Sequence, residues 1–210
     1  MYTGIVQRML PITQIERKPG LMSFGLKFDP DLLVDLEEGA SVAVNGCCFT
    51  VTGFDDSLVS FDAIQETLDL TNLKYLQEGS LVNIERSAKS DAEVGGHILS
   101  GHIVDTAMVS DITVSENNKR LTFKGDPAWL KFVFNKGFLA VNGCSLTVAH
   151  LDRDQSTFAI NLIPETLSRT NFELLKVGDE VNIEVESQTQ VIVETVERVL
   201  AERFPDQNVT

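Results

Sequence analysis

The sequence predicts an all-β protein made of two homologous modules followed by a C-terminal α-helix. Three observations lead to this fold class: an internal duplication, short β-branched segments separated by turn residues, and a tail without glycine or proline. Each of them is a property of residue order rather than of overall composition.

The duplication is the strongest signal in the chain. Four motifs occur twice in the same order and at nearly one spacing: Thr3-Gly4 and Ser100-Gly101, 44–51 and 141–148, 66–68 and 165–167, and 82–85 and 181–184. Ordered anchors of this kind indicate repeated structural units. We therefore expect an N-terminal module over residues 1–90, a C-terminal module over 98–186 and a helix over 187–206.

Each module is expected to consist of short strands. Residues 42–44, 49–52, 59–61 and 82–84 are rich in β-branched and aromatic side chains and are separated by Gly, Asn and Asp. The dipeptides Asn45-Gly46 and Asn142-Gly143 are strong signals of a tight turn between strands. Short strands at this spacing predict a small antiparallel barrel or sandwich in each module. The two Glu-Thr-Leu motifs tolerate a helical turn.

The tail has the periodicity of an amphipathic helix. Residues 188–204 contain neither Gly nor Pro, and Ile192, Val196, Val199 and Leu200 recur at helical spacing. This apolar stripe must be covered either by the chain's own barrel or by another copy of the chain. The sequence leaves both possibilities open.

Composition and charge restrict the class of protein. The 210 residues are 43% hydrophobic and 23% charged, as in ordinary soluble globular proteins, and the net charge is −14 without a basic block. Nucleic acid and anionic membranes are therefore unfavourable partners. The N-terminus lacks the pattern of a signal peptide, and no apolar run reaches the ~18 residues of a membrane span. Three cysteines, two of them adjacent, fit a reduced protein of the cytoplasm.

The strand after each Asn-Gly turn carries small hydrogen-bonding side chains on one face. Side chains alternate along a strand, so Cys48 and Thr50 share a face while Phe49 points to the core, and Ser145 and Thr147 repeat the pattern. Two such groups per module suit a planar heterocycle or a polyol. Small polar residues are also ordinary on a solvent-facing strand, but the repetition of the pattern favours a binding role.

A glycine-rich segment, residues 95–102, opens the second module. It matches neither the dinucleotide-binding nor the P-loop pattern, and the His and Cys spacings do not suit zinc. Histidine is the side chain best suited to proton transfer near neutral pH. His97 is compatible with a structural role, whereas His102 aligns with Ile5 and gives one module a titratable group that the other lacks.

These motifs resemble the riboflavin synthase family of lumazine-binding two-barrel proteins. The resemblance rests on residues 1–6, 43–51, 83–86, 95–102, 145–148 and 162–167 and extends over essentially the whole chain, the helical tail included.

The resemblance implies two six-stranded antiparallel Greek-key β-barrels and a C-terminal helix that holds a homotrimer. It implies the last step of riboflavin biosynthesis, in which two molecules of 6,7-dimethyl-8-ribityllumazine dismutate into riboflavin and 5-amino-6-(ribitylamino)pyrimidinedione. It further implies that no metal or organic cofactor is needed. The substrates would meet where the N-terminal barrel of one subunit faces the C-terminal barrel of another.

The resemblance also implies a set of site residues. The residues expected to act in catalysis are Ser41, Cys48, His102, Ser145 and Thr147. The substrate-binding residues expected in the first barrel are Gly4, Ile5, Val6, Cys48, Phe49, Thr50, Asp62, Ala63, Ile64, Gln65, Glu66 and Thr67. Those expected in the second barrel are Gly101, His102, Ile103, Lys136, Ser145, Leu146, Thr147, Ile163, Pro164, Glu165, Thr166, Leu167 and Ser168. With His102 and Ser145 in one set, the second barrel is expected to carry the more demanding chemistry.

Two residues depart from the family pattern. Tyr2 stands where the family commonly has Phe, and Glu186 stands where it commonly has Asp. The alternative function is that of a non-catalytic lumazine- or flavin-binding fluorescent protein with the same fold. In such proteins the second motif tends to decay, so the presence of His102, Lys136 and Ser145 favours the enzyme.

Overall fold

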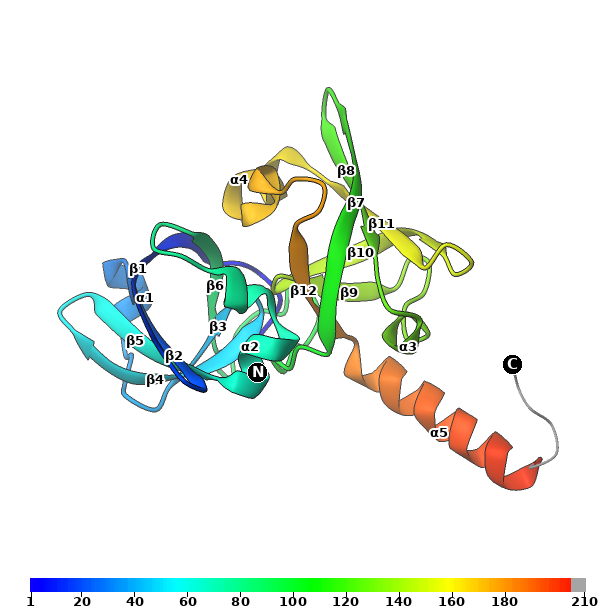
Figure 1. The fold of residues 1–210 in the computed structure, drawn as a ribbon, viewed down its shortest axis with the longest axis horizontal. Helices are drawn as coiled ribbons and strands as arrows, with labels where there is room; N and C mark the ends of the chain where they lie inside the picture. The colour runs from blue at the N-terminus through cyan, green and yellow to red at the C-terminus, as the bar shows by residue number, and fades with distance from the viewer. Residues whose placement is uncertain (205–210) are drawn as a thin grey trace.

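A computed structural model describes residues 1–204 and shows two closed antiparallel barrels of six strands each, with a C-terminal helix (Figure 1). The first barrel contains β1 (Arg8–Lys18), β2 (Leu21–Lys27), β3 (Ser41–Val44), β4 (Cys47–Asp55), β5 (Leu58–Ile64) and β6 (Leu81–Arg86). The second contains β7 (Asp105–Ser115), β8 (Asn118–Lys124), β9 (Phe138–Val141), β10 (Cys144–Asp152), β11 (Thr157–Leu162) and β12 (Glu180–Val185). Around the first barrel the order is β1-β2-β5-β4-β3-β6, and the second repeats it, so the predicted fold class is confirmed.

Short helices connect the strands at equivalent places in the two modules. They are α1 (Pro30–Leu33), α2 (Gln65–Leu70), η1 (Asn72–Tyr75), α3 (Pro127–Leu130), α4 (Pro164–Arg169) and η2 (Asn171–Leu174). The two Glu-Thr-Leu motifs lie in α2 and α4, as the predicted helical turn requires.

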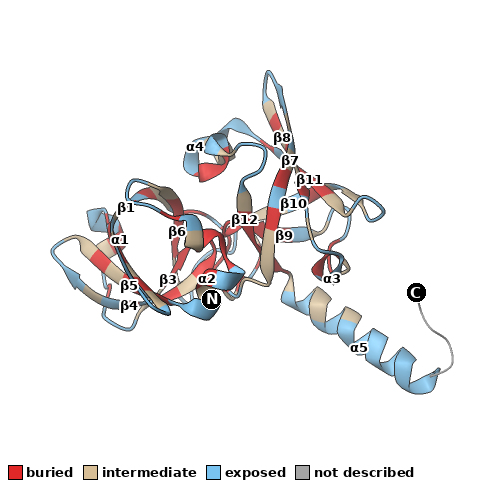
Figure 2. Cartoon of the chain, in the orientation of Figure 1, coloured by how far each residue is buried: buried red, intermediate tan, exposed pale blue. Residues whose placement is uncertain are grey.

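Each barrel has its own aromatic core. In the first, Phe24 and Phe61 stack with ring centroids 5.4 Å apart and Phe49 meets Phe24 edge-on; in the second, Phe123 stacks on Phe158. These rings are almost fully buried, and burying one contributes about 1.5–3 kcal/mol relative to leaving it exposed. Figure 2 shows the buried residues inside the two barrels. The predicted alternation on β4 is confirmed, since Phe49 is buried while Thr50 is exposed.

The two Asn-Gly turns lie back to back where the barrels meet. Asn45, Gly46, Asn142 and Gly143 all have positive φ, as a type I′ hairpin turn requires. A Cβ added to Gly46 would lie 2.6 Å from the backbone nitrogen of Gly143, so this contact excludes any larger residue.

Buried asparagine side chains join the barrels around these turns. The Oδ1 of Asn83 accepts from the backbone N–H of Asn171 at 2.8 Å, and its Nδ2 donates to the carbonyl of Asn142 at 2.9 Å. Asn182 makes the equivalent pair of bonds with Asn72 and Asn45. Equivalent residues of the two modules therefore make equivalent hydrogen bonds across the interface.

Helix α5 (Ser187–Arg203) extends away from both barrels (Figure 1), and none of its residues is buried. Val193 packs against the second core, and Lys131 forms a 2.6 Å ion pair with Glu197. Ile192 and Val196, by contrast, remain 63% and 51% exposed. Covering of the apolar stripe by the chain's own barrel, the first of the two predicted alternatives, is therefore wrong. Residues 205–206 of the predicted helical segment lie outside the described residues.

Candidate functional site

The segment at the start of each module crosses to a strand of the other module. The segment around Gly4 contacts β10, and the segment around Gly101 contacts β4. Tyr2 and Leu99 form an antiparallel bridge between the two segments. The backbone N–H of Cys48 in the first barrel donates to the carbonyl of Gly101 at 2.9 Å, and the N–H of Ser145 in the second barrel donates to the carbonyl of Gly4 at 2.8 Å.

This crossing corrects the predicted division of the site residues between the barrels. Val6 belongs to the second hydrophobic core, and Ile103 packs against the first. Residues 4–6 therefore complete the face of the second barrel, and residues 101–103 complete that of the first. The sequence repeat could not reveal this, because an alignment of modules says which residues are equivalent but not which barrel they contact.

Glycine is required at both crossing points. Gly4 and Gly101 have φ of 73° and 81°, and a Cβ on them would lie 2.5 Å from the Cβ of Ser145 and 2.6 Å from the Cβ of Cys48. The left-handed conformation and the close approach both exclude a side chain there.

Each crossing loop is held by a buried glutamate that sequence reasoning did not single out. Glu85 accepts from the backbone N–H groups of Thr3 (2.6 Å) and Gly4 (3.0 Å), and Glu184 accepts from those of Ser100 (2.7 Å) and Gly101 (3.0 Å). Burial raises the pKa of both carboxyls, and these hydrogen bonds oppose the shift. The signal was present in the sequence, since both glutamates end the repeated Val-Asn-Ile-Glu motif.

The face of the first barrel presents small polar groups beside the His102 loop. Ser41 on β3 pairs with Thr50 on β4, and Thr50 and His102 are exposed. Cys48 is half-buried, and the hydroxyl of Tyr2 donates to its Sγ at 3.0 Å. The departure at position 2 therefore adds a bond to a candidate catalytic side chain. Burial raises the pKa of the Tyr2 hydroxyl well above its usual range, so it stays a donor.

The other two cysteines are unsuited to chemistry. Cys47 and Cys144 are buried, and this burial raises the pKa of each thiol to about 12. A thiol rather than a thiolate persists there near neutral pH, which leaves a poor nucleophile and a poor metal ligand.

The face of the second barrel presents Ser145, Leu146 and Thr147 on β10. Ser145 and Leu146 are partly exposed and Thr147 is exposed. Lys136 is held beside this strand in the left-handed conformation (φ 66°), with its backbone N–H donating to the carbonyl of Val148 at 2.9 Å. The backbone of Lys136 is thereby held next to the strand that carries Ser145, and the residue is exposed.

His97 lies beside Ser145, a contact that the sequence did not predict. Its Nδ1 is 2.6 Å from the Oγ of Ser145, and its ring stacks on Phe138 with centroids 5.1 Å apart. The side chain is 8% exposed, and its Nε2 has no hydrogen-bond partner among the described residues. Burial lowers the pKa of His97, while the carboxylate of Glu186 opposes the shift. A neutral imidazole beside a hydroxyl is able to accept its proton.

Glu186 caps helix α5. Its carboxylate accepts from the backbone N–H groups of Gln188 at 3.1 Å and Thr189 at 2.6 Å. Partial burial raises the pKa of this carboxyl, but the two hydrogen bonds and the nearby His97 outweigh it and leave the pKa below its usual range. Glu186, which stands where the family commonly has Asp, therefore retains a carboxylate, and this carboxylate caps the N-terminus of α5.

The remaining predicted residues flank the two faces. Ala63 is fully buried and Phe49 almost so, which leaves neither side chain accessible to a ligand. Asp62 accepts from the hydroxyl of Ser23 at 2.6 Å. The other flanking residues lie in α2 or α4 or directly before them, and they are exposed or partly exposed: Ile64, Gln65, Glu66, Thr67, Ile163, Pro164, Glu165, Thr166, Leu167 and Ser168.

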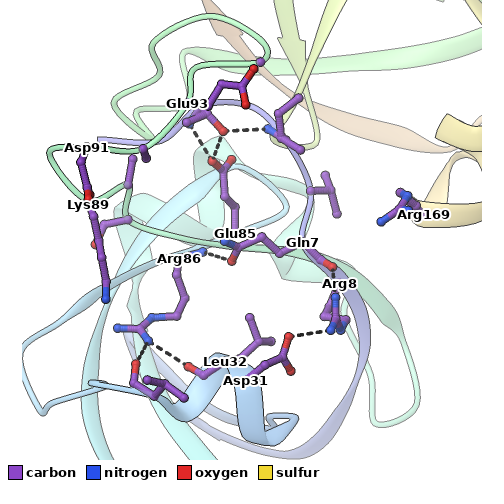
Figure 3. Close-up of a pocket in the computed structure, with 18 residues that line it drawn as sticks. Gln7, Arg8, Asp31, Leu32, Glu85, Arg86, Lys89, Asp91, Glu93 and Arg169 are labelled. Carbon is purple, nitrogen blue, oxygen red and sulfur yellow. Dashed lines mark hydrogen bonds and ion pairs between the residues drawn. The ribbon is translucent and has the colours of Figure 1, made fainter.

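A cavity of about 1150 Å³ lies next to the Gly4 loop (Figure 3). Ile5 and Val6 line it, but the strand residues of the two polar faces do not. Its cationic side chains already have partners: the guanidinium of Arg8 bonds to Asp31, and that of Arg86 donates to the carbonyl of Leu32. The cavity therefore offers mixed charge rather than a cationic site for an anion.

Within residues 1–204 no three His, Cys, Asp or Glu side chains are grouped as they would be around a metal ion. No helix of this part of the chain is both long enough and apolar enough to cross a membrane.

Comparison with known families identifies both modules. The model of the lumazine binding domain matches residues 3–87 and again residues 100–186. Two copies of one ligand-binding domain agree with the two barrels and their equivalent polar faces. The chain therefore belongs to the lumazine-binding domain family.

Relatives within the family carry more specific names. Riboflavin synthase of Escherichia coli K12 is 48% identical over 204 residues, which cover 97% of this chain and 95% of that protein. Riboflavin synthase of Buchnera aphidicola subsp. Schizaphis graminum is 41% identical over 95% of this chain and 96% of its own length. Among solved structures, LumP complexed with 6,7-dimethyl-8-(1'-D-ribityl) lumazine superposes with a TM-score of 0.80 at 27% identity, covering 89% of this chain and 99% of that one.

Proposed function

We propose that the chain is an enzyme that dismutates two molecules of 6,7-dimethyl-8-ribityllumazine into riboflavin and 5-amino-6-(ribitylamino)pyrimidinedione. The observation that carries the proposal is the presence of two equivalent polar faces in one chain, each completed by a loop from the other module. A reaction between two identical molecules needs two sites of this kind. The proposal is also supported by the similarity to riboflavin synthases, which are 48% and 41% identical over nearly the full length of the chain.

The first-barrel site is formed by Ser41, Cys48 and Thr50 with the His102 loop. The second-barrel site is formed by Ser145, Thr147 and Lys136 with the Ile5 loop. Because His102 and Ser145 belong to different sites within one chain, the demanding chemistry is shared between the barrels rather than confined to the second.

The reaction transfers a four-carbon unit from one lumazine to the other. A methyl group conjugated to the electron-poor ring is acidic, so the imidazole of His102 is suited to remove its proton. The other lumazine accepts a nucleophile on its ring, for which water or the hydroxyl of Ser145 is suited. Holding the two rings in reacting geometry lowers the barrier by ~7–11 kcal/mol.

The two sites come together between subunits of a homotrimer held by α5. The exposed apolar stripe of this helix, which includes Ile192 and Val196, supports this assembly because its own barrel leaves it uncovered. The protein is cytoplasmic, and its partners are lumazine and its own copies rather than membranes or nucleic acid. The acidic net charge of −14 supports this choice of partners.

The decisive experiment uses the purified chain after treatment with a chelator. Incubation with lumazine alone should yield riboflavin and the pyrimidinedione in equal amounts. A requirement for added metal or nucleotide would contradict the proposal. Binding of lumazine without conversion would instead support the alternative function, that of a non-catalytic lumazine- or flavin-binding protein.

A further inference from the structure

We propose that Glu85 and Glu184 are positioning residues, each of which holds the loop that completes the site of the opposite barrel. The inference rests on the proposed function, since it concerns the same two sites. It adds two buried carboxylates that touch no reacting group and act through residues 4–6 and 101–103.

The first argument is the direction of the hydrogen bonds. Glu184 lies on β12, where its backbone pairs with that of Ala140 on β9 within the second barrel. Its side chain does not serve this pairing. Oε1 accepts from the backbone N–H and the hydroxyl of Ser100, both at 2.7 Å, and Oε2 accepts from the N–H of Gly101 at 3.0 Å. The carbonyl of the same Gly101 then accepts from Cys48 of the first barrel.

The second argument is repetition. Glu85 lies on β6 of the first barrel, and its carboxylate accepts from the backbone N–H and hydroxyl of Thr3 at 2.6 and 2.7 Å and from the N–H of Gly4 at 3.0 Å. The carbonyl of Gly4 accepts from Ser145 of the second barrel. A buried carboxylate is costly to retain unless its hydrogen bonds are satisfied, yet both modules carry the same arrangement.

The third argument is the chemistry of the acceptor. Three donors converge on each side chain, and an ionised carboxylate is an acceptor at both oxygens. An amide of the same shape would point an NH₂ group at one of the donors. The carboxylate therefore specifies the orientation of the loop in a way that an isosteric neutral group does not.

The consequence is that each loop is anchored in one barrel and lies on the other. His102 follows Gly101 directly, so the carboxylate of Glu184 sets where the imidazole lies relative to Cys48. Ile5 follows Gly4, so Glu85 sets the equivalent position relative to Ser145.

The test compares Glu184→Gln and Glu85→Gln with Glu116→Gln, which removes the same charge from an exposed turn. Lumazine affinity is measured by fluorescence titration and turnover by riboflavin formation, both on the full chain. We expect each buried variant to lower kcat/KM by up to about 100-fold, the loss that a displacement of about 1 Å at a reacting group can cause. The Glu116 variant should match the unmodified chain.

Double-mutant cycles separate positioning from a general loss of stability. The effect of Glu184→Gln should be non-additive with that of Cys48→Ser and additive with that of Ser145→Ala. Glu85→Gln should show the reverse pattern. A merely structural role would couple each glutamate equally to both barrels, and this outcome would overturn the inference.

Loop-side variants keep the test available if a glutamine variant does not fold. Ser100→Ala and Thr3→Ala each remove one hydrogen bond to the carboxylate and should reproduce the same pairing pattern with effects of about fivefold. If the unmodified chain binds lumazine without forming riboflavin, the proposed function fails, and the pairing pattern is read from lumazine affinities. If riboflavin is formed and all four variants behave as Glu116→Gln does, the inference alone fails.

Discussion

The backbone N–H of Cys48 donates a 2.9 Å hydrogen bond to the carbonyl of Gly101, joining β4 of the first barrel to the loop that opens the second module. The equivalent hydrogen bond in the other half of the molecule runs from the backbone N–H of Ser145 to the carbonyl of Gly4. Each candidate site is therefore built from residues of both modules, although each module forms a closed barrel of its own.

Replacing Gly101 by Ala should damage the first-barrel site. The positive φ costs an L-residue roughly 1–2 kcal/mol, and the new Cβ would lie 2.6 Å from the Cβ of Cys48. We expect a loss of about 2–4 kcal/mol in the free energy of unfolding from strain and overpacking together and at least a tenfold loss of turnover. Gly39→Ala is the matched control, because Gly39 has a similar φ of 85° but no atom within 4 Å of the added Cβ. Equal losses in both variants would show that strain alone is responsible.

Replacing His102 by Gln should lower turnover by about 100-fold, the usual contribution of a general acid–base group. The reason is that glutamine retains hydrogen bonding but cannot exchange a proton near neutral pH. Ser145→Ala should also lower turnover, and Cys48→Ser should be milder because a polar group of similar size remains. Single-turnover measurements give the ordering. His150→Gln is the control on an exposed histidine of β10, and a silent His102 variant would refute the assignment.

Placing a charge on the apolar stripe of α5 should prevent assembly. Ile192→Glu puts a carboxylate on the exposed stripe, whereas Ala201→Glu puts one on the opposite side of the helix. Sedimentation velocity should show smaller, folded particles for the first variant only. Riboflavin formation should likewise be lower for that variant only. Deletion from Gln188 onward should have the same effect. An intact oligomer after this deletion would mean that α5 has no role in assembly.

Removing an asparagine from the inter-barrel cluster should destabilise the chain. Asn83→Ala leaves the N–H of Asn171 and the carbonyl of Asn142 without their 2.8 and 2.9 Å partners. Unpaired buried groups cost about 1–3 kcal/mol each, so urea unfolding should show a loss of about 2–6 kcal/mol for the two groups. Asn161→Ala, at an exposed position of β11, should change stability little. A cost no larger than that of the control would mean that the cluster adds nothing to stability.

Acid should destabilise the chain through His97. Burial lowers the pKa of this imidazole in the folded state below the ordinary 6.5, and Glu186 only partly opposes the shift. Between these two pKa values the unfolded chain binds a proton that the folded chain does not, so stability falls as pH drops through about 6.5. Glu85 and Glu184, whose pKa values are raised, act in the opposite direction as pH falls toward 4.5.

The His97 contribution is isolated by comparison with His97→Gln. Urea midpoints measured from about pH 7.5 to pH 5 should fall more steeply for the unmodified chain than for the variant. Parallel curves would show that His97 titrates alike in the folded and unfolded states.

Local patterns were enough to predict the positions of β3, β4, β5 and β6, the two Asn-Gly turns and the C-terminal helix, whereas β1 and β2 were not singled out. The alternation of Cys48, Phe49 and Thr50 specifies which side chains enter the core, because successive side chains of a strand point to opposite faces. The Asn45-Gly46 dipeptide specifies a turn because Asn and Gly tolerate positive φ. The spacing of Ile192 and Val196 specifies one face of a helix. These features depend on neighbours within a few residues, and the repeat supplied a second copy of the strand and of the turn.

Only the tertiary structure decided which parts of the two modules meet. Residues 4–6 and 101–103 are equivalent in the repeat, but each segment lies on the other module's barrel. Glu85 and Glu184 hold the two segments in this position by hydrogen bonds to Gly4 and Gly101. The contact between His97 and Ser145 and the uncovered stripe of α5 were equally hidden. The sequence by itself determined the two modules and their polar faces, because periodicity is local. Partners far apart in the chain are chosen by packing and by the pairing of buried polar groups, which exist only once both barrels have closed.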